Sequence, residues 1–190
     1  MNGYLTNPLI FLVSVVFGLY ALALLLRFLL QVVRADFYNP LSQFLVRITN
    51  PVVRPARRLI PGLGGLDLAS LLLAWLVKSL EIALLIVLTE TAANPLRAFA
   101  WAIPDLVELT IFVFLVALFV RVVLSWINGG GYNLAATVIY DLTSPLLRPI
   151  RRWLPSDTGG IDFSPLVAGV VLMLGWYLIL PPLRAITGTG

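Results

Sequence analysis

Arginine is the residue type most able to do chemistry in this sequence, because it occurs in two clusters of one pattern. Arg-Pro-x-Arg-Arg appears in NPVVRPARR at 50–58 and in SPLLRPIRR at 144–152. A guanidinium can donate two parallel hydrogen bonds to a phosphate or a carboxylate, and near an anionic membrane surface each basic side chain contributes about 1 kcal/mol. The clusters predict an anchor on anionic lipid headgroups, or a docking site for a phosphate-bearing ligand or an acidic partner protein, at Arg54, Arg57, Arg58, Arg148, Arg151 and Arg152.

Two residue types that carry much of enzyme chemistry are absent from the chain. It contains no cysteine and no histidine. Disulfides, thiolate metal ligands, thiol nucleophiles and the commonest general base are therefore excluded. We expect a protein that is not an enzyme, with no catalytic residue, no cofactor and no metal site.

A lysine and a glutamate lie within a long apolar segment. Lys78 and Glu81 are three residues apart near the middle of segment 68–88, a spacing that lets them pair on one face of a helix. Ionisable groups inside a membrane are costly and are functional candidates by default. We therefore mark this pair as a candidate site inside the membrane.

Two further arginines and two aspartates occur at related positions in the two halves. Arg27 and Arg121 each lie close to the end of an apolar segment, where a long side chain can extend to the membrane surface, form an ion pair or contact a lipid phosphate. Asp67 and Asp162 each precede the next apolar segment on the same side of the membrane. They are the natural acidic partners of the arginines, and they also suit the start of a helix, where a carboxylate caps free N–H groups.

The elements that must position these side chains are apolar. Of the 190 residues, 60% are hydrophobic and 12% are charged, and the mean hydropathy is +0.99. A bilayer core needs about 20 residues of helix, and lipid offers no partner for free backbone groups. We therefore predict an all-α membrane protein with four transmembrane helices, at about 9–33, 68–88, 106–127 and 163–183.

Two shorter segments are amphipathic. In 39–50, Leu41, Phe44, Leu45 and Ile48 follow a helical spacing, and 133–144 has the same pattern. Helices this short cannot span, so we expect each to lie in the headgroup plane. A proline follows each segment, at Pro51 and Pro145 in turn, and is expected to end or bend the helix. The arginines would then lie in a turn rich in Arg and Pro.

The second half of the chain repeats the first. A shift of 94 positions places 27–61 on 121–155 without a gap, and 11 of the 35 residue pairs are identical, most of them polar or Pro. This pattern indicates tandem units at 1–92 and 93–190. Because each unit spans twice, the second unit enters the membrane from the same side, and the repeats are parallel.

Arginine placement also predicts orientation. The loops after the first and third spans hold most of the arginines, so both should face the cytoplasm and both termini the periplasm or exterior. The net charge of +4 fits this rule better than a nucleic-acid partner, and we expect none. The uncharged N-terminal stretch MNGYLTNP lacks the basic start of a cleavable signal peptide, so the first span is expected to stay in the mature protein.

The duplicated pattern resembles the YggT family of bacterial and plastid membrane proteins. The resemblance rests on Pro-x-x-Arg-Pro-x-Arg-Arg-x-x-Pro followed by Gly-Gly-x-Asp in both halves, and on Asp162, Ser164 and Pro165 in the second. In the first unit, Ala69 and Ser70 stand where the family commonly has Ser-Pro, so the likeness there is limited to Asp67. The resemblance to the family implies an inner-membrane location and roles linked to osmotic stress and ion uptake, to cell division, or to assembly of a membrane cytochrome complex.

Two functions follow as hypotheses. In the first, the chain is a non-enzymatic membrane organiser, assembly factor or stress-tolerance factor whose basic cytoplasmic face binds anionic lipid, a membrane-protein partner or another copy of itself. In the second, it is a small conduit for ions or osmolytes, with Lys78, Glu81 and Arg121 lining a path. Four helices rarely leave an aqueous lumen, so a conduit would need oligomerisation.

Overall fold

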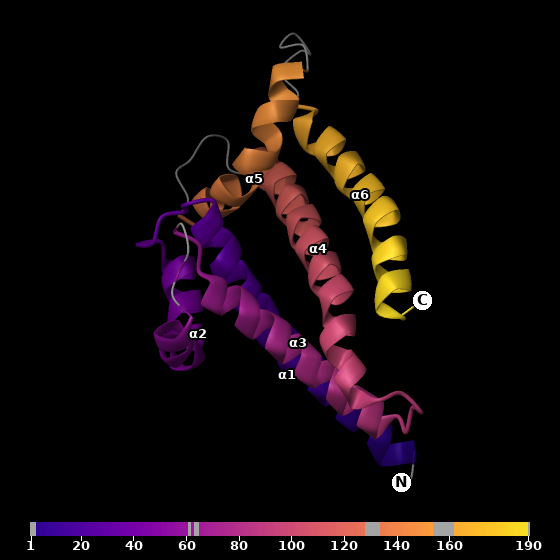
Figure 1. Cartoon of the computed structure of the whole chain (residues 1–190). Helices are drawn as coiled ribbons and strands as arrows, with labels where there is room; N and C mark the ends of the chain where they lie inside the picture. Colours follow the sequence, from indigo (N-terminus) through magenta and orange to yellow (C-terminus); the bar gives the residue numbers. More distant parts are fainter. Residues whose placement is uncertain (1–2, 61, 63–64, 128–133, 154–161, 190) are drawn as a thin grey trace.

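The computed structural model describes residues 3–60, 62, 65–127, 134–153 and 162–189, and within these ranges all regular structure is helical. The described residues form six α-helices and one short 3₁₀ helix, in the order that Figure 1 shows. Their bounds are α1 Gly3–Val32, α2 Pro40–Leu59, α3 Leu68–Leu88, η1 Pro95–Arg97, α4 Ala98–Ile127, α5 Leu134–Trp153 and α6 Ser164–Thr187.

Four of the described helical segments are long and apolar enough to cross a membrane, at Thr6–Val32, Leu68–Leu88, Pro95–Trp126 and Ser164–Thr187. Large apolar side chains on them point outward; Phe119, for example, is 69% exposed. Such a surface needs lipid around it. The prediction of an all-α membrane protein with four spans is confirmed. The third span begins earlier than predicted, because the helix continues through Pro104.

The two units are each built on a pair of long helices. α1 packs along α3, α4 packs along α6, and α3 contacts α4 to join the units. The Trp75 indole N–H of α3 donates to the carbonyl of Phe99 in α4 at 2.9 Å. In Figure 1 both termini lie away from α5, as expected when the first and third spans run toward the basic segments and the second and fourth run back.

The two amphipathic helices have different surroundings. In α2, Leu41, Phe44 and Ile48 are exposed, while Ser42 and Thr49 face the protein. These three apolar side chains can enter lipid, as expected for an interfacial helix, while Leu45, the fourth residue of the stripe, packs against the protein core. In α5, the stripe residues Val138 and Leu142 are instead buried in a core cluster with Leu25 and Leu29 of α1 and Val113 of α4. The apolar stripe of α5 therefore helps to hold the two units together.

The predicted turn rich in Arg and Pro is wrong. α2 continues through Pro51 and Pro55, and α5 continues through Pro145 and Pro149. Each proline removes one helical hydrogen bond, but a spacing of four places both on one helix face, and all four are exposed. The carbonyls left without a donor can then meet water or headgroups, so the helix bends rather than ends. The predicted helices 39–50 and 133–144 thus extend to Leu59 and Trp153.

Candidate functional site: two arginine clusters and an ion pair within the membrane

In unit 1, two arginines converge on one aspartate. Arg57 Nε donates to Asp67 Oδ1 at 3.1 Å, and Arg57 Nη2 donates to Oδ2 at 2.6 Å, a bidentate pair. Arg27 Nε lies 3.4 Å from the same Oδ2. The side chains of Arg27 and Asp67 are only 6% and 2% exposed. The structure therefore brings together the predicted pair and adds Arg57, which ties α2 to the start of α3.

Arg27 also links α1 to α2. Its Nη1 donates to Thr49 Oγ1 at 2.7 Å and to Asn50 Oδ1 at 3.0 Å. Thr49 in turn donates to the Leu45 carbonyl. Because these partners all belong to the protein, Arg27 does not extend into the headgroups but fixes the amphipathic helix against the first span.

Asp67 combines pairing with capping. It is the N-cap of α3 and accepts from the backbone N–H of Ser70 at 3.4 Å and from its hydroxyl. Burial opposes a charge on Asp67, but the hydrogen bonds from Arg57 and Ser70 and the positive charges of Arg57 and Arg27 outweigh it, so the pKa of this carboxyl lies below its ordinary value.

The equivalent cluster of unit 2 is more open. Arg151 pairs with Asp162, but their side chains are 47% and 45% exposed. Arg121 donates to Thr143 Oγ1 at 2.6 Å, and its guanidinium carbon lies 4.7 Å from the ring centroid of Tyr140. Among the described residues no ion pair joins Arg121 to Asp162. Partial burial again opposes the charge on Asp162, but hydrogen bonds from Ser164 and Arg151 lower its pKa overall.

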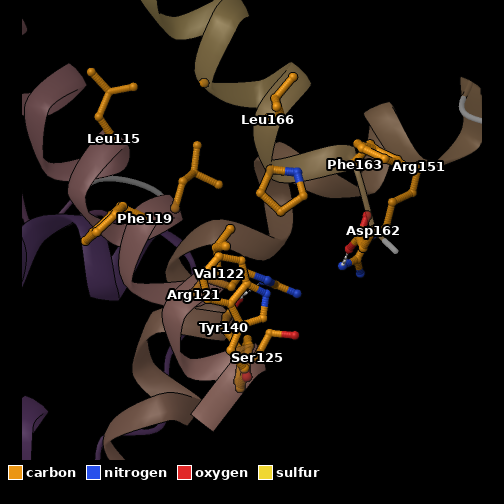
Figure 2. A pocket seen from close by; sticks show the side chains of 14 residues that line it. Leu115, Phe119, Arg121, Val122, Ser125, Tyr140, Arg151, Asp162, Phe163 and Leu166 are labelled. Atoms are coloured by element: carbon orange, nitrogen blue, oxygen red, sulfur yellow. Dashed lines mark hydrogen bonds and ion pairs between the residues drawn. The ribbon is translucent and has the colours of Figure 1, made fainter. Parts of the chain in front are cut away.

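Each cluster borders a cavity. In unit 2, a cleft of about 810 Å³ lies between α4, α5 and α6. Figure 2 shows Arg151 with Asp162 on one side of it and Arg121 beside Tyr140 on the other. In unit 1, a cavity of about 630 Å³ lies between the C-terminal end of α1, α2 and Gly65. Four arginines line the unit 1 cavity: Arg27, Arg34, Arg54 and Arg57.

The remaining predicted arginines of the clusters have no acidic partner in the part of the chain that the structure describes. Arg58 follows Arg57 in the last turn of α2, and Arg148 and Arg152 occupy the second half of α5; all three are exposed. None of them lines either of the two cavities. No carboxylate of the described residues neutralises their charges, which can act on a group outside the protein.

Lys78 and Glu81 pair inside the membrane, and a third charge joins them. Lys78 Nζ lies 3.0 Å from Glu81 Oε2 and 3.7 Å from Asp105 Oδ2 of α4. Sequence reasoning missed Asp105, because it lies one residue before the predicted start of the third span. Its place next to Pro104, at the edge of a long apolar segment, was the signal in the sequence that could have identified it as a charged residue of the third span. Glu108 of α4 pairs with Arg184 of α6.

The described residues contain no group of three side chains able to hold a metal ion. What the clusters can do chemically is bind anions, through guanidinium groups at the membrane surface, or hold charge within the membrane, at Lys78, Glu81 and Asp105.

Comparison with known proteins gives one family. The CCB3/YggT family model matches the chain twice, at residues 6–89 and 100–183. The uncharacterized protein PA0392 of Pseudomonas aeruginosa is 43% identical over 186 residues, covering 97% of this chain and 94% of that protein. The uncharacterized protein YggT of Escherichia coli K12 is 41% identical over 168 residues, covering 88% and 86%. No solved structure matches the chain.

Proposed function

The chain belongs to the CCB3/YggT family, and we propose that it is a non-enzymatic membrane organiser or assembly factor whose basic face binds anionic lipid headgroups. One observation carries this proposal. Arg58, Arg148 and Arg152 are exposed on two repeat-related amphipathic helices and have no acidic partner among the described residues, whereas Arg57 and Arg151 are held by aspartates. Exposed guanidinium groups at the ends of membrane helices suit headgroup phosphates.

The first prediction removes these three charges. Arg58→Gln, Arg148→Gln and Arg152→Gln together are expected to weaken binding of anionic lipid by about 3 kcal/mol at low salt, at about 1 kcal/mol for each arginine. Folding should be little changed, because none of the three makes an ion pair with a described residue. The measurement is the enrichment of phosphatidylglycerol over phosphatidylcholine around the purified protein in mixed nanodiscs.

Two controls sharpen this test. The same three positions changed to Lys keep the charge and should retain most of the enrichment. Arg97→Gln removes an exposed arginine from the connection between the units and should have no effect. Equal enrichment for the wild type and the triple Gln variant would contradict the lipid proposal and direct attention to a protein partner.

Orientation is part of the same proposal. We place the basic ends of α2 and α5 in the cytoplasm of a bacterial inner membrane and both termini outside it, following the excess of arginine. A reporter that is active only in the periplasm should be active when fused to the C-terminus, and inactive when inserted between α2 and α3. A C-terminal fusion with cytoplasmic activity would overturn this orientation.

A second function is favoured by the charges within the membrane. Glu81 is 5% exposed, and with Lys78 and Asp105 it places three ionisable groups between α3 and α4. Such groups mark many ion pathways, and the conduit is therefore the alternative proposal. Selective ion flux into liposomes that contain the purified protein, abolished by Glu81→Gln, would favour the conduit over the organiser.

A further inference from the structure

The unit 1 cavity has an unusual balance of charge. Arg27, Arg34, Arg54 and Arg57 line it, and no described aspartate or glutamate does. The nearby Asp67 lies behind Arg27 and Arg57 and neutralises one charge at most. In the unit 2 cleft, by contrast, Asp162 lies among the lining residues with Arg121 and Arg151. The unit 1 cavity therefore keeps an excess of positive charge that the described residues lining it do not balance.

Two of these arginines are not committed to an acidic partner. Arg27 and Arg57 contact Asp67, whereas Arg34 and Arg54 form no ion pair with a described carboxylate. Arg34 has a φ of 55°, in the left-handed region, at the C-terminal end of α1. Its N–H donates to the Gln31 carbonyl, and the next N–H, of Ala35, donates to the Leu30 carbonyl. Glycine usually occupies this helix-ending position. Here the position carries a long, positively charged side chain instead.

Ser42, whose buried hydroxyl has no partner in the described part of the chain, is among the residues that line the same cavity. Ser42, in the first turn of α2, is 6% exposed, and its Oγ is the one buried side-chain polar atom among the described residues that has no hydrogen-bond partner. Ser42 lines the cavity. Buried polar groups are nearly always hydrogen-bonded, and an exception calls for an explanation. The repeat-related position in unit 2 is Ala136, so the fold itself does not require a hydroxyl there.

We propose that the unit 1 cavity binds a phosphate group, held by the guanidinium groups of Arg34 and Arg54 and by the Ser42 hydroxyl, with Arg27 and Arg57 adding positive charge. This inference rests on the proposed affinity of the basic face for phosphate-bearing groups and assigns that affinity to a defined cavity. A phosphate offers several oxygens in a tetrahedral arrangement, so donors can approach it from different helices. A carboxylate, with two oxygens in one plane, would satisfy fewer of them.

The phosphate can come from a phospholipid headgroup or from free phosphate in solution. Apolar side chains on the same cavity, Leu30, Phe37 and Leu45, can contact a glycerol backbone or the first part of an acyl chain. The experiment therefore has two arms. Delipidated protein in detergent is titrated with inorganic phosphate by calorimetry, and the same protein is examined by native mass spectrometry after incubation with phosphatidylglycerol.

Arg34→Gln and Ser42→Ala are the test variants. Each is expected to weaken phosphate binding at least about tenfold, the usual effect of losing a hydrogen bond to a charged group. Ser42→Ala should leave the melting temperature without ligand unchanged or raise it, because it removes a buried polar group that has no partner. A structural role for Ser42 would instead lower that temperature. Arg97→Gln, outside both the cavity and the basic face, is the control and should bind as the wild type does.

Each outcome decides. Binding of inorganic phosphate identifies a site for free phosphate, and binding of phosphatidylglycerol alone identifies a headgroup site; either supports the proposal when both variants weaken it. Binding in neither arm, or equal binding by wild type and both variants, overturns it. If the triple variant at Arg58, Arg148 and Arg152 keeps full lipid enrichment while the cavity variants lose phosphate, the surface proposal fails and the cavity proposal stands.

Discussion

Asp67→Asn is expected to lower the free energy of unfolding by about 3–5 kcal/mol, the usual cost of removing one partner from a buried ion pair. The change leaves the Arg27 guanidinium buried without a carboxylate, and Arg57 loses its bidentate partner. It also replaces Oδ2, the acceptor of the Ser70 hydroxyl, with an amide NH₂ group, while the amide oxygen of Asn can still cap α3. The measurement is the thermal midpoint of the purified protein in detergent at neutral pH.

Asp162→Asn is the matched control, because the repeat places an equivalent aspartate in a different environment. The Arg151–Asp162 pair is nearly half exposed, and exposed pairs contribute about 0–1 kcal/mol. The expected loss of stability is therefore small. Similar losses of stability for the two variants would contradict the argument that burial makes the unit 1 ion pairs contribute more to the free energy of unfolding.

Acid provides a second readout of the Asp67 variant. The pKa of Asp67 is lowered on folding from an ordinary value of 3.8, so its charged form contributes stability above that value. The contribution is lost as the pH falls below 3.8 through the lower pKa of the folded state. The wild type should therefore lose stability more steeply than Asp67→Asn in this acidic range. Parallel acid dependence of the two proteins would contradict the low pKa.

The spans and the repeat could be predicted from the sequence, whereas Asp105 and some of the contacts among the charged residues could not. Arg27 and Asp67 could be paired because both sit at helix ends on one side of the membrane. Arg57 could not be predicted as a further partner. A proline can either end or bend a helix, so the sequence did not show whether residues 51–59 are helical. With α2 continuous to Leu59, Arg57 falls beside Asp67 and becomes its closest partner.

Periodicity also could not say what covers an apolar face. The stripes of α2 and α5 follow the same spacing, yet Phe44 is 58% exposed and Leu142 is 3% exposed. The difference arises from tertiary packing, because the α5 stripe lies against α1 and α4, whereas in the α2 stripe only Leu45 packs against that cluster and Leu41, Phe44 and Ile48 are exposed. A duplicated sequence thus gave two helices with different roles, one facing lipid and one joining the units.

Lys78→Met is expected to destabilise the protein by about 3–5 kcal/mol, because it leaves Glu81 buried without its cation. Glu81 is 5% exposed, and the same lysine also lies 3.7 Å from Asp105. Adding Glu81→Leu to this variant removes the unpaired carboxylate and should restore most of the stability, since apolar residues often replace a buried ion pair without loss. A shift of 95, which places Asp67 on Asp162, makes Met173 and Trp176 the repeat-related positions, so an equivalent helix is built without charge there. The measurement is the thermal midpoint of both variants.

The double variant also separates the two proposed functions. If the pair has only a structural role within α3, Lys78→Met with Glu81→Leu should be stable and should keep the lipid enrichment of the wild type. If the pair lines a conduit, the double variant should be equally stable but should lose ion flux in liposomes. A double variant no more stable than Lys78→Met alone would contradict both readings of the pair, because Asp105, 37% exposed, would then be the carboxylate that depends on the lysine.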